Sequence, residues 1–189
     1  TLPMSAEATV PISQAQEGLF VALRAIRRSL PLFGPAAHTV ALSPTGQWQA
    51  VAAEEGPVRI YRQSQRVPLH TLSATSKATH LLWKDKSTLV VGYLDGSVRL
   101  FAIPEGRLLM TLAAHRDRIS ELMLVDDGKL MLSASLDGSA ALWELPSGQL
   151  RRRFDSGGQR VSSARMGAGR VFLASASGSV EVLRASDGS

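Results

Sequence analysis

The sequence predicts an all-β fold in which a unit of four short antiparallel strands recurs about every 40 residues. The first observation is a set of turn glycines that are separated by 40, 42 and 40 residues, namely Gly56, Gly96, Gly138 and Gly178. The second is a large apolar residue five positions after each glycine, at Tyr61, Phe101, Trp143 and Leu183. The third is the alternation of apolar and polar residues in segments such as "TLVVGYL" and "SVRLF", which is typical of strands.

The segment before the repeats has a different pattern. We expect residues 1–12 to be flexible and residues 13–37 to form an amphipathic helix with its linker. Within "SQAQEGLFVALRAIRRSL" (13–30), Ser13 and Gln16 have the spacing of a capping box, with Ser13 as N-cap. An apolar stripe with helical spacing follows at Leu19, Leu23, Ile26 and Leu30. We expect the helix to pack against the repeats or a neighbouring domain; a membrane-surface helix or a partner-docking helix are the alternatives.

The four repeat units are expected at about 38–72, 73–112, 113–154 and 155–189. Asp95-Gly96 and Asp137-Gly138 favour tight hairpins, because aspartate and glycine tolerate positive φ at low cost. The segments "PEGRLLMTL" and "PSGQLRRRF" supply a further turn and an outer strand. A unit of four antiparallel strands in about 40 residues is typical of one blade of a β-propeller.

The repeats do not fill a whole number of blades. Residues 38–189 correspond to about 3.8 units, so the fourth unit is expected to lack its outer strand. Propellers have about four to eight blades, and an open array would expose apolar end faces to water. We therefore expect a partial ring, which is either an ordered portion of a longer protein or is completed by a second chain.

The third unit contains "AAH" at 113–115 followed by "SASLDGSAALWE" at 133–144. With these features residues 38–189 resemble the blades of WD-repeat proteins. The family pattern has Gly-His before the first strand and Trp-Asp at the end of the third, whereas this chain has Ala114-His115 and Trp143-Glu144. The other units are more degenerate and end in Phe101-Ala102, Tyr61-Arg62 and Leu183-Arg184.

The resemblance implies a structural role for the polar residues of the third unit. In WD-repeat blades a histidine, a serine, an aspartate and a tryptophan form a hydrogen-bonded tetrad, which here corresponds to His115, Ser133 or Ser135, Asp137 and Trp143. The alternative is Ser-His-Asp catalysis, but no Gly-x-Ser-x-Gly segment provides the exposed turn that a nucleophile needs. We expect the tetrad to fix the geometry of this blade and to make it the most rigid of the four.

Catalysis and cofactor binding are not expected. His38, His70 and His80 do not have ligand spacing and the chain contains no cysteine, so we predict neither a metal site nor a cofactor. The glycine-rich "DSGGQR" at 155–160 lacks the following Lys-Ser or Lys-Thr of a phosphate loop. The expected inner strands, "TVALS" and "ELMLV", offer few catalytic groups. Part of a propeller-fold enzyme remains the alternative from a different functional class.

The charge is basic but scattered. The 189 residues have a net charge of +5, with clusters only at Arg24, Arg27 and Arg28 and at Arg151, Arg152 and Arg153. The second cluster lies in an expected outer strand, where charged side chains normally discourage edge pairing. An acidic partner is the alternative there, and we do not expect nucleic acid because aromatic residues are not interleaved with the arginines. No run approaches the roughly 20 apolar residues of a membrane span and no signal peptide is present, so we expect a cytoplasmic protein.

The sequence therefore predicts a non-catalytic protein interaction or sensor module of a larger protein or assembly. Its partners are expected to be proteins, including further blades or domains of the same protein. Loops on a rigid scaffold commonly bear function, and the charged loop residues before the first strands are Lys77, Arg116, Asp117 and Arg118. The helix before the first unit also resembles the junction in bacterial STAND-type signalling proteins, while a eukaryotic scaffold subunit is the competing context.

Overall fold

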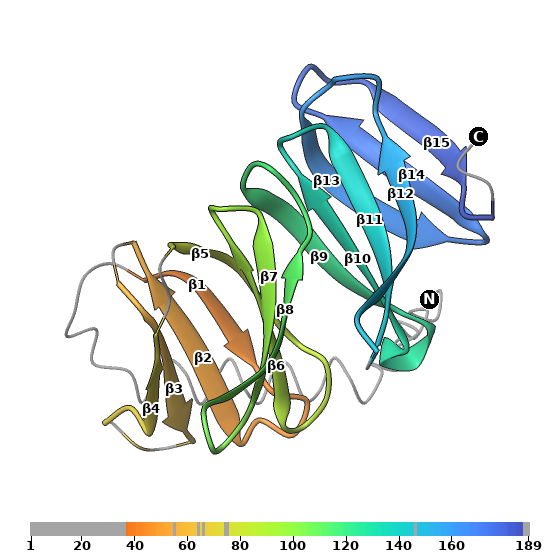
Figure 1. The fold of residues 1–189 in the computed structure, drawn as a ribbon. Helices are drawn as coiled ribbons and strands as arrows, with labels where there is room; N and C mark the ends of the chain where they lie inside the picture. The colour runs from red at the N-terminus through yellow and green to blue at the C-terminus, as the bar shows by residue number, and fades with distance from the viewer. Residues whose placement is uncertain are drawn as a thin grey trace, which may run out of the picture.

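The computed structural model describes residues 37–186, except for residues 55, 64, 66, 74, 75 and 146. This part of the chain is all-β: fifteen strands form four antiparallel sheets that follow one another along the chain (Figure 1). We call these sheets blades one to four. The expected helix over 13–30 and the expected flexible segment 1–12 lie outside the described residues.

Each blade is a meander in which consecutive strands are hydrogen-bonded neighbours. Blade one contains β1 (Ala37–Leu42), β2 (Trp48–Ala53), β3 (Val58–Arg62) and β4 (His70–Leu72). Blade two contains β5 (Ala78–Trp83), β6 (Thr88–Tyr93), β7 (Ser97–Ala102) and β8 (Arg107–Ala113). Blade three contains β9 (Ile119–Val125), a 3-10 turn at Asp126–Gly128, β10 (Leu130–Ser135), β11 (Ser139–Glu144) and β12 (Gln149–Asp155). Blade four contains β13 (Val161–Gly167), β14 (Arg170–Ser175) and β15 (Val180–Arg184).

The repeat glycines form the hairpins between the second and third strands. Gly96 has a φ of +81° and Gly138 a φ of +89°, a region that residues with a Cβ rarely adopt. Space is also limited at Gly96, where a Cβ would lie 2.4 Å from the carbonyl oxygen of His115. The hairpin of blade two is thereby held directly against the loop that leads into blade three.

The blades pack face to face, and the core lies between them (Figure 1). Trp48 and Ile60 of blade one pack with Leu89 and Phe101 of blade two in the first buried cluster. The second cluster joins blades two and three and contains Val98, Leu112, Ile119, Met131 and Trp143. The third joins blades three and four and contains Leu132, Leu142, Phe154, Val171 and Leu173. Each buried interface thus joins one face of a blade to the opposite kind of face on the next.

No helix in the described residues is long and apolar enough to cross a membrane. The fourth blade has three strands within the described part of the chain, and its open edge is β15. This agrees with the expectation that the fourth unit lacks an outer strand.

Candidate functional site

The loop between β8 and β9 places His115 at the junction of two blades. The backbone N–H of His115 donates a hydrogen bond to the carbonyl oxygen of Gly96 in blade two, at 3.1 Å. Its buried side chain turns into blade three, where Nε2 lies 2.8 Å from Ser133 Oγ on β10. The other ring nitrogen, Nδ1, lies 2.8 Å from Ser139 Oγ at the start of β11. One residue therefore fastens the connection between the two blades.

A continuous chain of hydrogen bonds extends from both sides of this imidazole. Trp143 Nε1 donates to Ser133 Oγ at 2.9 Å, and Ser139 Oγ donates to Asp137 Oδ1 at 2.6 Å. The carboxylate of Asp137 also accepts hydrogen bonds from the backbone N–H groups of Ser139 (2.9 Å) and Arg116 (2.8 Å). We call Trp143, Ser133, His115, Ser139 and Asp137 the blade-three network.

The donors and acceptors of this network fit only one direction of proton donation. The carboxylate of Asp137 can only accept, so Ser139 uses its single hydroxyl proton there. His115 must then donate from Nδ1 to Ser139, which leaves Nε2 of the neutral ring as an acceptor for the hydroxyl proton of Ser133. The indole N–H of Trp143 donates to Ser133, so every polar group in the network has a partner.

The protonation states agree with this direction. Burial lowers the pKa of His115 to about 4, and the attraction of Asp137 only partly opposes that effect. Burial pushes the pKa of Asp137 upward, but hydrogen bonds from the Ser139 side chain and from the Arg116 and Ser139 backbones hold it below its ordinary value. A neutral imidazole beside an ionised carboxylate is the state that the hydrogen bonds require.

Access decides whether this serine and histidine could react with a substrate. Ser133 is completely buried, and its oxygen already contacts His115 and Trp143. A nucleophile needs an exposed oxygen beside donors that stabilise the developing charge. Ser133 has no such exposure, so the Ser-His contact serves to hold the blade together.

Two serines differ from the expectation for the tetrad. Ser135, one of the two candidates, does not contact His115: it donates to the carbonyl oxygen of Asp117 at 2.8 Å and accepts from the backbone N–H of Asp137 at 3.0 Å. Ser139 was not predicted, although it joins the histidine to the aspartate. A signal was present, because Asp-Gly-Ser also occurs at 95–97, where Ser97 Oγ donates to Asp95 Oδ1 at 2.6 Å.

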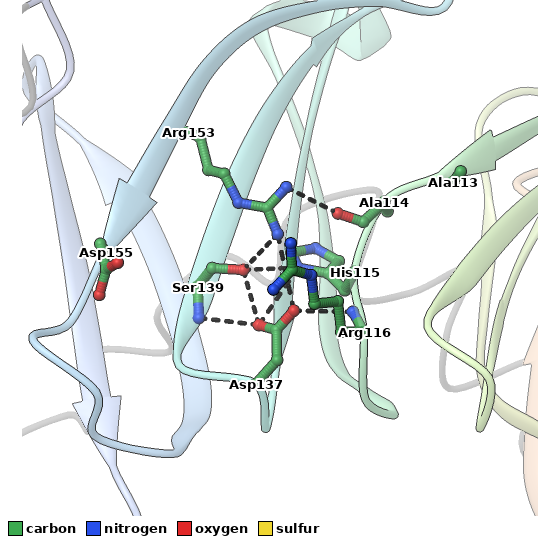
Figure 2. A pocket seen from close by; sticks show the side chains of 8 residues that line it. All are labelled: Ala113, Ala114, His115, Arg116, Asp137, Ser139, Arg153 and Asp155. Atoms are coloured by element: carbon green, nitrogen blue, oxygen red, sulfur yellow. Dashed lines mark hydrogen bonds and ion pairs between the residues drawn. The ribbon is translucent and has the colours of Figure 1, made fainter.

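A cavity of about 480 Å³ opens beside the network, on the blade edge that holds the His115 loop. Figure 2 shows the residues that line it: Ala113, Ala114, His115, Arg116, Asp137, Ser139, Arg153 and Asp155. The side chain of Arg153, from the outer strand β12, lies across the cavity. Its guanidinium donates to the carbonyl oxygen of Ala114 at 3.2 Å and to Ser139 Oγ at 2.9 Å, and lies 3.6 Å from the carboxylate of Asp137. The cavity therefore has a fixed polar base.

The four charged loop residues expected at the partner surface fall into two pairs. Lys77 forms an ion pair with Glu54 of blade one, and this contact lowers the pKa of Glu54. Asp117 pairs with Arg160 at the start of blade four, at 3.5 Å. Arg116 and Arg118 extend exposed side chains beside the cavity. The first pair thus bridges neighbouring blades, and the second pair is free to meet a partner.

The remaining histidines do not gather into a site. His38 lies on β1, His70 on β4 and His80 on β5. Within the described ranges of the chain, no group of three His, Cys, Asp or Glu side chains is arranged to hold a metal ion.

Comparison with known families gives the architecture its place. Residues 40–125 match the family described as the anaphase-promoting complex subunit 4 WD40 domain. The blades are WD repeats. No curated protein sequence matches the chain.

Two computationally designed proteins have structures similar to these WD blades. The designed Ika4 protein is 25% identical with a TM-score of 0.71, and the match covers 82% of this chain and 96% of Ika4. The designed Ika8 protein is also 25% identical with a TM-score of 0.72, and the match covers 82% of this chain and 48% of Ika8. The WD blades thus span nearly all of one designed chain and about half of the other.

Proposed function

We propose that this chain is a non-catalytic interaction module that recognises a protein through the loops around Arg116 and Arg118. The observation that supports this most directly is the division of its polar residues. The residues that could have performed chemistry are buried and bonded to one another, with both nitrogens of His115 engaged. The exposed arginines lie at the edge of a cavity on a rigid sheet scaffold, where loops commonly bind partners.

The cavity favours a polar segment of a partner protein. Arg116 and Arg153 supply positive charge, and Asp137 and Asp155 supply negative charge within the same lining. A mixed lining of this kind suits a peptide that offers both an acidic group and backbone donors, and it disfavours a uniformly charged polyanion. WD-repeat domains are typical interaction modules, and a sensor or scaffold within a larger protein or assembly is the context that this role would serve.

The test compares two charge-reversal variants. Arg116→Glu together with Arg118→Glu changes the proposed surface, whereas Arg107→Glu together with Lys129→Glu makes the same charge change at exposed positions on the opposite blade edge. A photo-crosslinking residue placed at position 116 or at position 107 then identifies what each edge contacts in the source cells.

The proposal predicts a crosslinked protein from position 116 that the first variant loses and the second retains. Retention of the same partner by the first variant would contradict the surface assignment. A hydrolytic activity of the intact protein that disappears in His115→Ala, without loss of folding, would contradict the non-catalytic role.

A further inference from the structure

One face of blade four is apolar and open to solvent. Phe172 lies opposite Val182 in the strand register, and Ala174 lies opposite Val180, so these four side chains share one face of β14 and β15. Phe172, Val180 and Val182 are 39%, 61% and 46% exposed. We call this surface the blade-four end face.

The repeat shows what such a face does elsewhere in the molecule. The equivalent residues of blade three, 40 positions earlier, are Leu132, Ala134, Ala140 and Leu142, and none is more than 4% exposed. They are buried because blade four packs against them, with β10 lying against β13. The blade-four end face therefore has the apolar character of a blade interface without a neighbouring blade.

Blade one presents the complementary kind of face at the other end of the array. Val40 lies opposite Val51 on this side of the sheet, and Leu42 and Tyr61 share the same side. The equivalent residues of blade two are Leu81, Val91, Leu89 and Phe101, all of which pack in the first buried cluster. Val40, by contrast, is 45% exposed. We call this surface the blade-one end face.

We propose that the blade-four end face of one chain docks on the blade-one end face of a second copy, so that two chains complete one ring of eight blades. Every internal interface already joins these two kinds of face, with the second strand of one blade against the first strand of the next. Contacts between unlike faces close into a ring when the rotation allows it, and eight blades lie within the usual range of about four to eight. The WD blades also match about half of the designed Ika8 chain, which has room for two such units.

The inference depends on the end faces and not on the loops around Arg116, so its failure would leave the proposed function untouched. The experiment is sedimentation equilibrium of the 189-residue chain and of three variants. Val182→Glu places a charge in the blade-four end face, and Val40→Glu places one in the blade-one end face. Leu108→Glu is the matched control, since Leu108 is 48% exposed on the outer strand β8, away from both ends.

The proposal predicts a dimer for the unmodified chain and for Leu108→Glu. Each end-face variant should dissociate roughly 100-fold more readily or worse, because a carboxylate would be buried in an apolar contact. Circular dichroism and thermal unfolding should show that all four chains are equally folded, since every substituted position is exposed in the single chain.

Three outcomes would overturn the proposal. A folded monomer at all concentrations would show that a second copy does not cover these faces, and that a blade from elsewhere must do so. Assemblies larger than a dimer would show an open array instead of a closed ring. Dissociation by Val182→Glu but not by Val40→Glu would show that two blade-four end faces pair with each other.

Discussion

His115 Nδ1 and Asp137 Oδ1 lie 3.6 Å apart, and the hydroxyl group of Ser139 connects them. This is an indirect contact, unlike the direct hydrogen bond between histidine and aspartate in a catalytic triad. The hydroxyl passes the orienting effect of the carboxylate to the ring and fixes the proton on Nδ1. The blade-three network is therefore arranged to hold one neutral tautomer in place and not to accumulate positive charge on the histidine.

Removing this connecting hydroxyl should destabilise the fold. Ser139→Ala leaves the Nδ1–H of His115 without its acceptor and takes one donor from Asp137, so we expect the free energy of unfolding to fall by about 1–3 kcal/mol. Urea denaturation measures the change, with Ser147→Ala as the control because Ser147 is exposed in a turn. Equal values for the two variants would mean that the hydroxyl contributes nothing to the network.

The indole donor of Trp143 can be separated from its packing. Trp143 and Trp83 are both 6% exposed, but Trp143 Nε1 donates to Ser133, whereas Trp83 Nε1 has no hydrogen-bond partner among the described residues. Both tryptophan-to-phenylalanine variants lose similar apolar area, and only Trp143→Phe loses a hydrogen bond. We expect Trp143→Phe to be less stable than Trp83→Phe by about 1 kcal/mol in the same denaturation experiment. A larger loss in Trp83→Phe would contradict the role of the indole N–H.

Stability should decrease as the pH falls below neutrality. The pKa of His115 is lowered to about 4 in the folded chain from 6.5, so the unfolded chain binds more protons between these two values. The free energy of unfolding from this residue is complete above about pH 6.5 and should fall by on the order of 3 kcal/mol as the pH approaches 4. Denaturation at pH 7 and pH 4.5 measures it, and His115→Gln should show a much weaker dependence. The remaining slope should reflect His80, whose pKa is also lowered by burial.

The close approach at Gly96 can be tested against a glycine with the same backbone and open space. Gly96→Ala brings a Cβ within 2.4 Å of the His115 carbonyl oxygen, whereas at Gly178, with a φ of +91°, a Cβ meets nothing within 4 Å. Gly178→Ala should reduce stability by about 1 kcal/mol because of its backbone conformation. Gly96→Ala should cost on the order of 3 kcal/mol or more, since the loop must also move. Melting temperatures that shift equally would indicate that the loop yields without cost.

Much of the architecture was predictable, because turns depend on local chemistry. The glycines at steps of 40, 42 and 40 residues all have positive φ, and Trp143 lies on the third strand of its blade as expected. The hairpin aspartate was also placed correctly, since Asp137 followed by Gly138 is a strong turn signal. The helix predicted over 13–30 stays a prediction.

The details of the network were harder to foresee, because they depend on where side chains point across strands. Ser133 and Ser135 lie on the same strand, and the sequence could not decide which of them meets His115. Ser139 looked like an ordinary strand residue, although the repeated Asp-Gly-Ser pattern was visible. Arg153 was expected to be a solvated edge charge, but its guanidinium contacts Ala114 and Ser139 across the cavity.

The central claim is that the polar residues of blade three hold the fold together and leave function to the exposed loops. Nitrogen NMR of the imidazole of His115, recorded from pH 8 to pH 5, tests it most directly. The hydrogen bonds predict a neutral ring that keeps its proton on Nδ1 and does not titrate across this range, in line with a pKa of about 4. A proton on Nε2, or a midpoint near 6.5, would mean that the ring is not fixed by Ser139 and Asp137 and would contradict the account.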